Sequence, residues 1–238
     1  LEKFLGRSLG SLADLETALA ADFERNRKGC RMVTVKTGLA YLRQLLFRKV
    51  ARADAERDFD RMRQTPGSPP PDDPLARWTE IPFRNLQDYV FHSLVRLLSE
   101  HGMPMQVHTG IQAGANYVPN SNPTGLANVF MLYPDVKFDL FHSGYPYLSE
   151  TVTLAKMFPN VYVDLCWTHI ISPSAAQRAL NEYLDTLASN KIMGFGGDYR
   201  YAEQTYGHCA VARENIIQVL ESRVAAGYFR QPHAIAAL

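Results

Sequence analysis

The stretch Met103–Gly110, MPMQVHTG, is a short apolar run that ends on a histidine and is followed at once by a glycine turn. Two later stretches repeat this design: residues 137–144 read KFDLFHSG, and residues 191–200 read KIMGFGGDYR. Each run is too short for a stable helix and is bounded by glycine or proline. The sequence therefore predicts three buried strands, each followed at its C-terminal tip by a polar, chemically useful side chain.

These side chains are His108, His142 and Asp198. Parallel α/β sheets and barrels collect their chemistry at the C-terminal ends of strands. A single histidine at a strand end is often a core residue bonded to the backbone, and a single aspartate there is often a helix cap. Three such residues, each at the C-terminal tip of a predicted strand, are harder to obtain by chance. We therefore interpret the three residues together as a metal-binding or acid–base set.

Composition limits the classes of partner and compartment. The chain has 238 residues, a net charge of +1 and interspersed acids and bases, so we expect neither nucleic acid nor a membrane as partner. No apolar run approaches the roughly 20 residues that cross a bilayer. The three cysteines are odd in number and form no CxxC pair, which favours a reducing cytoplasm over a disulfide framework or a thiolate zinc site. A homo-oligomeric assembly of the protein stays an open alternative.

Strand and helix patterns alternate along the chain. The predicted strands cover residues 31–36, 103–108, 137–142, 160–165 and 191–196, and the predicted helices cover 11–28, 39–47, 50–62, 85–99, 124–132, 148–157, 172–188 and 207–224. Such alternation predicts βαβ units and a parallel sheet in sequence order, curved as part of a barrel.

Two connecting segments interrupt this regularity. Residues 64–82 include three consecutive prolines, so we expect a Pro-rich connector that packs at the C-terminal side of the sheet as a partial lid. The long loop 110–123 lies on the same side and is expected to be functional. His92 and His101 are expected to face solvent.

Four motifs in this order and spacing, VHTG, FHSGYP, NVYVDLCW and GFGGDYR, resemble the second half of a metal-dependent amidohydrolase barrel. The resemblance extends from about residue 11 to residue 225, and it is strongest to the amidohydrolase-related branch. It implies a TIM-type (β/α)8 barrel in which His108 binds the metal. It also implies that His142 is a second ligand or an acid–base group, and that Asp198 binds metal and takes a proton from the bound water.

The sequence departs from this family in one respect. The first barrel strand of the family carries a His-x-His pair, and no two histidines here are separated by one residue. Counting back, the strand at 31–36 would be the fourth. We therefore expect residues 1–238 to form one amidohydrolase-related domain that corresponds to strands four to eight of a longer barrel, a piece that could be inactive alone.

The resemblance implies a divalent metal, zinc first, with manganese or iron as alternatives. The predicted function is hydrolysis of an amide, lactone or similar carbonyl bond of a small molecule by metal-activated water. Two alternatives stay open: decarboxylation of a small carboxylic acid by the same metal site, and a catalytically incomplete barrel.

Four further residues are candidates for substrate binding: Lys36, Arg43, Trp167 and Arg200. The two arginines follow strand tips and could hold an anionic group with both nitrogens. In some amidohydrolases a fourth-strand lysine is carbamylated and bridges two metals. We favour the simpler interpretation that Lys36 pairs with Asp198 or with a substrate carboxylate.

Overall fold

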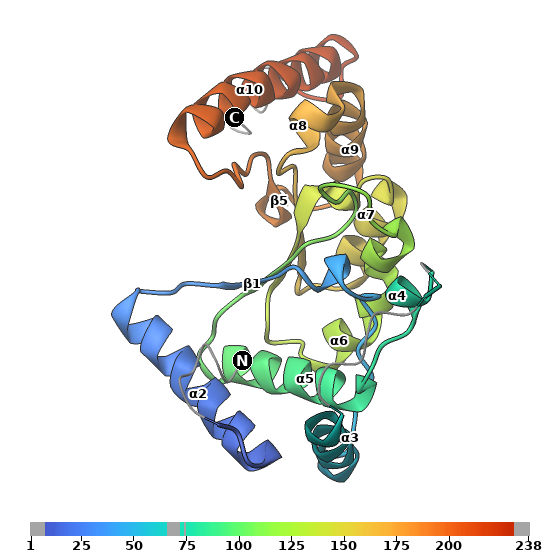
Figure 1. Ribbon diagram of the computed structural model, residues 1–238. Helices are drawn as coiled ribbons and strands as arrows, with labels where there is room; N and C mark the ends of the chain where they lie inside the picture. The colour runs from blue at the N-terminus through green and yellow to red at the C-terminus, as the bar shows by residue number, and fades with distance from the viewer. Residues whose placement is uncertain (1–7, 66–71, 74, 231–238) are drawn as a thin grey trace.

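Five short strands form one parallel sheet in the computed structural model, which describes residues 8–65, 72–73 and 75–230 (Figure 1). The sheet order β1-β2-β3-β4-β5 follows the sequence, and every neighbouring pair is parallel. The predicted topology is therefore confirmed. The strands are β1 Val35–Thr37, β2 Met105–Val107, β3 Phe138–Leu140, β4 Val161–Asp164 and β5 Ile192–Met193.

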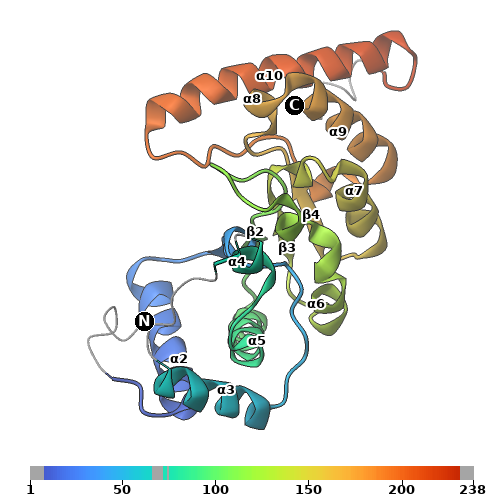
Figure 2. The same ribbon diagram turned by 45° about the vertical axis from the view of Figure 1, so that its right-hand side comes forward.

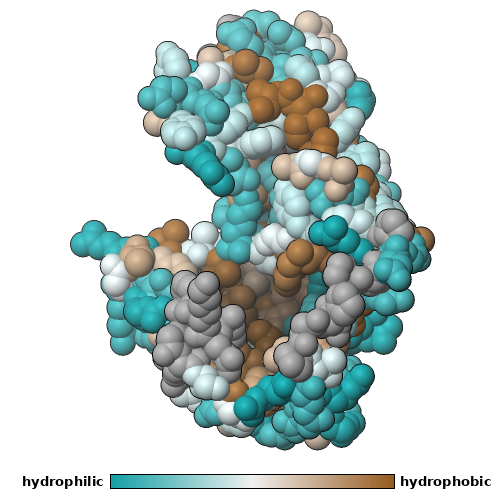
Figure 3. Space-filling model, in the orientation of Figure 1, coloured by the Kyte–Doolittle hydropathy of each residue, from teal (hydrophilic) through white to brown (hydrophobic). Residues whose placement is uncertain are grey.

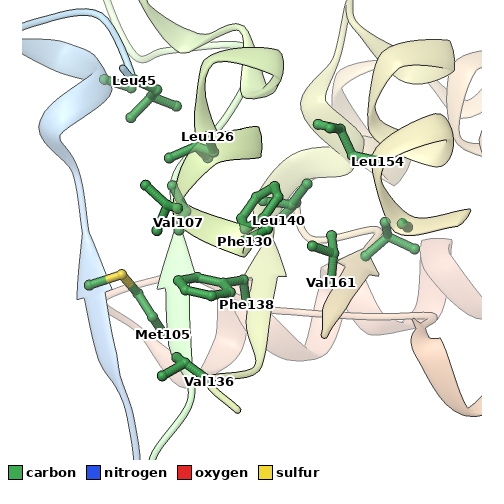
Figure 4. Close-up of a cluster of buried hydrophobic side chains, with 14 of the residues drawn as sticks. Leu45, Met105, Val107, Leu126, Phe130, Val136, Phe138, Leu140, Leu154 and Val161 are labelled. Atoms are coloured by element: carbon green, nitrogen blue, oxygen red, sulfur yellow. The ribbon is translucent and has the colours of Figure 1, made fainter. Parts of the chain in front are cut away.

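Side chains alternate between the two faces of this sheet, as strand geometry requires. One face is apolar and packs against the helices, as Figure 4 shows for Met105, Val107 and Phe138. Full burial of each such side chain is worth roughly 1.5–3 kcal/mol, so this face anchors the fold. The opposite face is polar, and there Gln106 donates from Nε2 to Oδ2 of Asp139 at 3.2 Å.

The helices gather above, beside and below the sheet in the views of Figures 1 and 2. Helices α8 to α10 lie together at the top, α6 and α7 lie at one side, and α2, α3 and α5 lie at the bottom. Their bounds are α2 Leu12–Gly29, α3 Arg52–Gln64, α4 Ala76–Thr79, α5 Arg84–Glu100, α6 Ala127–Leu132, α7 Leu148–Met157, α8 Thr168–Ile171, α9 Pro173–Thr186 and α10 Ala202–Ala225. Among the described residues, none of the helices is long and apolar enough to cross a bilayer.

Local signals set several helix ends where the sequence predicts them. Ser11 caps α2 by accepting from the Asp14 backbone N–H, and Ser172 caps α9 by accepting from the Ala175 N–H. Pro173 occupies the first turn of α9, where a missing N–H costs nothing. The predicted helix at 148–157 is confirmed by α7.

The prediction of a helix over 39–47 is wrong. Only a single 3-10 turn forms, at Leu39–Tyr41, and the chain then runs to Phe47 without regular structure. Tertiary contacts explain the difference: Leu45 and Phe47 are fully buried, and the Leu45 N–H donates to the carbonyl of Asn120. These contacts outweigh the modest helix propensity of the segment.

Other boundaries shift by a few residues. The five strands are shorter than predicted, because only two to four residues of each run make ladder contacts with a neighbour. The last helix begins at Ala202 rather than at 207, and α9 ends at Thr186 rather than at 188.

The described part of the Pro-rich connector packs beyond the C-terminal end of β2. It contains α4, where the carbonyl of Trp78 accepts from Nδ2 of Asn120 at 3.0 Å. Residues 66–71 and 74 lie outside the described residues, so a lid over the site stays a prediction. The face of the molecule in Figure 3 is mainly hydrophilic, with hydrophobic side chains visible in a hollow in its lower half.

Candidate metal site

Three side chains from separate strand tips converge in one pocket. His108 follows β2, His142 follows β3, and Asp198 lies in the loop after β5. Nε2 of His142 is 3.0 Å from Nδ1 of His108 and 3.9 Å from Oδ2 of Asp198. The predicted convergence is therefore confirmed, whereas the chemical roles of the three residues stay predictions.

The curvature of the sheet makes this convergence possible. Lys36 belongs to β1 and Asp198 follows β5, so the two residues come from opposite edges of the sheet. Nζ of Lys36 nevertheless lies 2.6 Å from Oδ2 of Asp198. Neighbouring strands lie about 4.8 Å apart, so a flat sheet would separate these edges by roughly 19 Å. The ion pair closes across the mouth of a barrel-like sheet, as the favoured interpretation of Lys36 predicts.

The backbone around the site adopts conformations that L-residues rarely take. His142, Trp167 and Asp198 have positive φ angles of 65°, 62° and 50°. Such strain is found preferentially where surrounding contacts hold a functional side chain in place. Gly110 allows two turns of the backbone to approach closely, because a Cβ there would lie 2.4 Å from the backbone of Gly144 in the adjacent turn.

Hydrogen bonds fix which ring nitrogens of the two histidines carry protons. Nδ1 of His142 lies 3.0 Å from the carbonyl oxygen of Cys166, and Nε2 of His108 lies 3.0 Å from the carbonyl oxygen of Ile111. A carbonyl oxygen only accepts, so each of these nitrogens carries a proton. In neutral rings the other two nitrogens are then unprotonated. The unprotonated Nε2 of His142 and the unprotonated Nδ1 of His108 are therefore 3.0 Å apart.

Burial keeps both rings neutral. The pKa of His108 is lowered to about 4, first by desolvation and then by the neighbouring His142 and Lys36 charges. The pKa of His142 is also lowered, chiefly by desolvation. Near pH 7 each imidazole is therefore neutral, with one ring nitrogen free of a proton, which is the state that a metal ligand requires.

The donor set fits a divalent metal ion. Ring nitrogen and carboxylate ligands lie about 2.0–2.2 Å from such an ion, so two ligands of one ion are at most roughly 4.4 Å apart. The spacings of 3.0 Å and 3.9 Å around Nε2 of His142 satisfy this limit. The unprotonated nitrogens of the two histidines and the Asp198 carboxylate are donor types that a divalent ion accepts. His142 and Asp198 belong to a group whose donor atoms all lie within 4.8 Å of one another, and His108 adjoins this group through its contact with His142.

The pocket beside these residues is small and mostly apolar. Its volume is about 210 Å³, and Trp167 is one of the residues that line it. The Tyr41 ring lies against His108 with centroids 4.6 Å apart. Pocket residues that the sequence prediction missed are Tyr41, Ile111, Gln112, Ala113 and Ile171. Those at 111–113 could have been found, because they directly follow the HTG turn; Tyr41 and Ile171 enter only through folding.

Cys166 is a further residue at the site that the sequence analysis did not predict as a metal ligand. Its sulfur lies with donor atoms of His142 and Asp198 in a group whose members are all within 4.8 Å of one another. Burial raises the pKa of this thiol well above its usual range, so it is a neutral thiol near pH 7. The sequence signal was its place directly after a strand tip, in NVYVDLCW.

Two arginines predicted to bind substrate do not line this pocket. Arg43 is 2% exposed and pairs with Asp88 at 2.6 Å while also donating to the carbonyl of Leu46. A guanidinium committed to a buried carboxylate is structural, so its substrate-binding prediction is corrected. Arg200 is exposed and lies outside the described pocket lining.

The prediction that His92 faces solvent is wrong. Its side chain is 4% exposed, with Nδ1 3.0 Å from the Tyr133 hydroxyl and Nε2 3.3 Å from the carbonyl of Phe47. The irregular segment that ends at Phe47 covers the helix face that periodicity assigned to water. His101, in contrast, is exposed as predicted.

The sequence matches a family model described as Amidohydrolase over residues 18–222. The chain belongs to the amidohydrolase family. It also shares 33% identity over 114 residues with the protein fluG of Emericella nidulans, a match that covers 45% of this chain and 13% of that protein.

Solved structures show the same fold. A Lactobacillus casei protein described as a metal-dependent hydrolase aligns with 99% of this chain and 59% of its own chain, at a TM-score of 0.77 and 22% identity. The uronate isomerase of Thermotoga maritima aligns with 99% of this chain and 53% of its own, at a TM-score of 0.77 and 16% identity. The chain thus spans little more than half of these structures, and its five parallel strands form part of a TIM-type barrel.

Proposed function

We propose that this protein is a metal-dependent hydrolase that acts on an amide, lactone or similar carbonyl bond of a small molecule. The single observation that carries the proposal is the convergence of three potential ligands, with Nε2 of His142 lying 3.0 Å from Nδ1 of His108 and 3.9 Å from Oδ2 of Asp198. When bound, a divalent ion of this kind polarises a carbonyl oxygen and makes water acidic enough to react near neutral pH. Zinc is the first candidate, and manganese or iron would accept the same donors.

The residues of the chain supply the remaining functions. Asp198 is the proposed base, because its carboxylate is partly exposed at the pocket and can accept a proton from water. Nζ of Lys36 forms an ion pair with Oδ2 of this carboxylate at 2.6 Å and holds it at the pocket. Trp167 lines the pocket and donates from Nε1 to the Gly197 carbonyl at 3.0 Å, which holds the loop that carries Asp198.

The size of the pocket supports a small substrate. At about 210 Å³ it falls below the range of roughly 300–1,000 Å³ that drug-sized ligands occupy. The aromatic rings of Tyr41 and Trp167 at its wall favour an apolar or planar group beside the reacting carbonyl.

A decarboxylase is the alternative reaction. A carboxylate substrate would need a cation aimed at the site, and Lys36 is the one predicted cation that approaches Asp198. Arg43 is committed to Asp88, and Arg200 is outside the described pocket lining, so this alternative has less support than hydrolysis.

The test combines metal binding with activity of the 238-residue protein. We expect isothermal titration with ZnCl2 to show one tight site, which His142→Ala and Asp198→Asn abolish or greatly weaken. The zinc-loaded protein should then hydrolyse members of a panel of small amides and lactones, and Asp198→Asn should remove that activity. His101→Ala is the matched control, because this exposed histidine lies outside the pocket lining. Absence of zinc binding by the folded wild-type chain would overturn the proposal and favour an incomplete barrel. Decarboxylation without hydrolysis would favour the lyase.

A further inference from the structure

The last residue of β4, Asp164, directs its carboxylate at the backbone of the candidate metal site. The side chain is 3% exposed. Its Oδ1 accepts two backbone N–H groups, that of His142 at 2.9 Å and that of Cys166 at 3.0 Å. One buried oxygen thus ties together the chain after β3 and the chain after β4, next to a candidate metal ligand.

The backbone at His142 needs such support. His142 and Ser143 both have positive φ angles, 65° and 53°. The left-handed conformation is unfavourable for a non-glycine residue, so it persists only where contacts hold it. The bond from the His142 N–H to Asp164 is one such contact, and the Ser143 hydroxyl adds another by donating to the Asp164 carbonyl at 3.0 Å.

The second bond to Asp164 acts on the imidazole ring. It holds the backbone of Cys166, whose carbonyl oxygen accepts the Nδ1–H of His142. The same carboxylate therefore fixes both the main chain from which the ring of His142 projects and the acceptor that the ring contacts. Because that acceptor keeps the proton on Nδ1, Nε2 stays unprotonated, 3.0 Å from Nδ1 of His108 and 3.9 Å from Oδ2 of Asp198.

We propose that Asp164 is a positioning residue that sets the orientation and tautomer of His142, and thereby the metal affinity of the site. The claim about affinity rests on the proposed function, whereas the claim about the tautomer does not. Neighbours that orient a metal-binding histidine typically change affinity about 10- to 100-fold when they are lost.

Three substitutions separate the position of the acceptor oxygen from the chemical group that carries it. Asp164→Asn retains an oxygen at the same position and replaces the carboxyl group by an amide, whereas Asp164→Glu retains the carboxyl group and displaces the oxygen by one methylene. Asp164→Ala removes the acceptor. The matched control is Asp139→Asn, which changes another buried aspartate, on the neighbouring strand, where the bonding partner is Gln106.

The tautomer is measured on histidine labelled with 15N, by long-range 1H–15N correlation spectra of the metal-free protein, with the His142 signals assigned from their loss in His142→Gln. We expect wild type, Asp164→Asn and Asp139→Asn to show His142 protonated on Nδ1. Asp164→Ala and Asp164→Glu should show a mixture of tautomers. Zinc titration should give a Kd at least about tenfold weaker for Ala and Glu than for Asn and the control.

The result that overturns the proposal is an unchanged His142 tautomer in folded Asp164→Ala, or an equal change in Asp139→Asn. If Asp164→Ala does not fold, the Asn and Glu proteins decide the question, and identical tautomers in these two would reject the positioning role. A wild type that binds no zinc but shows the expected tautomer, lost in Asp164→Ala, rejects the proposed function and leaves the positioning role intact.

Discussion

Replacing Lys36 by methionine distinguishes the two interpretations of this residue. Nζ of Lys36 is 2.6 Å from Asp198 Oδ2 and 4.2 Å from the centroid of the Phe141 ring, and its side chain is 31% exposed. If Lys36 acts as a free ammonium, it competes with a metal for the same carboxylate oxygen. If it is carbamylated and bridges metals, it is itself a ligand, and its removal has the opposite effect.

The size of the effect follows from these distances. An ion about 2.1 Å from Oδ2 would lie no more than roughly 5 Å from Nζ. At this separation a doubly charged ion and an ammonium repel by about 1.7 kcal/mol even at the dielectric constant of water. Removing the ammonium should therefore strengthen zinc binding by roughly 15-fold or more. The loss of a partly exposed ion pair should cost at most about 1 kcal/mol of folding free energy.

The assay is competition for zinc with a chromogenic chelator at pH 7.5, for wild type and Lys36→Met. Lys49→Met is the matched control, because it removes the same charge from an exposed position outside the pocket lining. The control should bind zinc as the wild type does. Weaker zinc binding by folded Lys36→Met would refute the competing-cation interpretation and support a lysine-derived ligand.

Three further perturbations test other parts of the structure. Trp167→Phe removes the Nε1 donor to Gly197, so we expect a loss of about 1 kcal/mol in unfolding free energy together with weaker zinc binding, both measurable on one preparation. Burial lowers the pKa of His208 to about 4. The unfolded chain therefore binds the proton first, and up to about 3 kcal/mol of stability is lost as the pH falls from 6.5 to 4. Urea unfolding at both pH values should show a smaller loss for His208→Phe, and an equal loss would contradict this assignment. Asp88→Ala leaves the buried guanidinium of Arg43 unpaired and should cost about 3–5 kcal/mol in the same assay, whereas a cost near zero would refute its structural role.

The sequence alone determined the features that depend on local pattern. Short apolar runs bounded by glycine or proline predicted the parallel strands, and the repeated strand–His–Gly design singled out His108 and His142. Capping signals are equally local, which is why Ser172 and Pro173 marked the start of α9 correctly. In each case the interactions that decide the structure lie within a few residues of one another.

Tertiary structure alone decided which predicted side chains meet. Arg43 follows a strand tip as a substrate-binding arginine would, but the partner that captures it, Asp88, lies 45 residues away. His92 occupies the helix face that periodicity assigns to solvent, yet the irregular segment ending at Phe47 covers that face. No local pattern encodes either contact, because both depend on how distant segments pack.

The sequence alone could not predict which ring nitrogens of the two histidines carry protons. The sequence placed His108 and His142 at adjacent strand tips, but only the distances to two backbone carbonyls show which nitrogen of each ring carries the proton. The role proposed for Asp164 has the same origin, since its carboxylate reaches back 22 residues to the His142 N–H. A strand pattern fixes where a side chain starts, whereas the hydrogen bonds that orient its ring come from packing between strands.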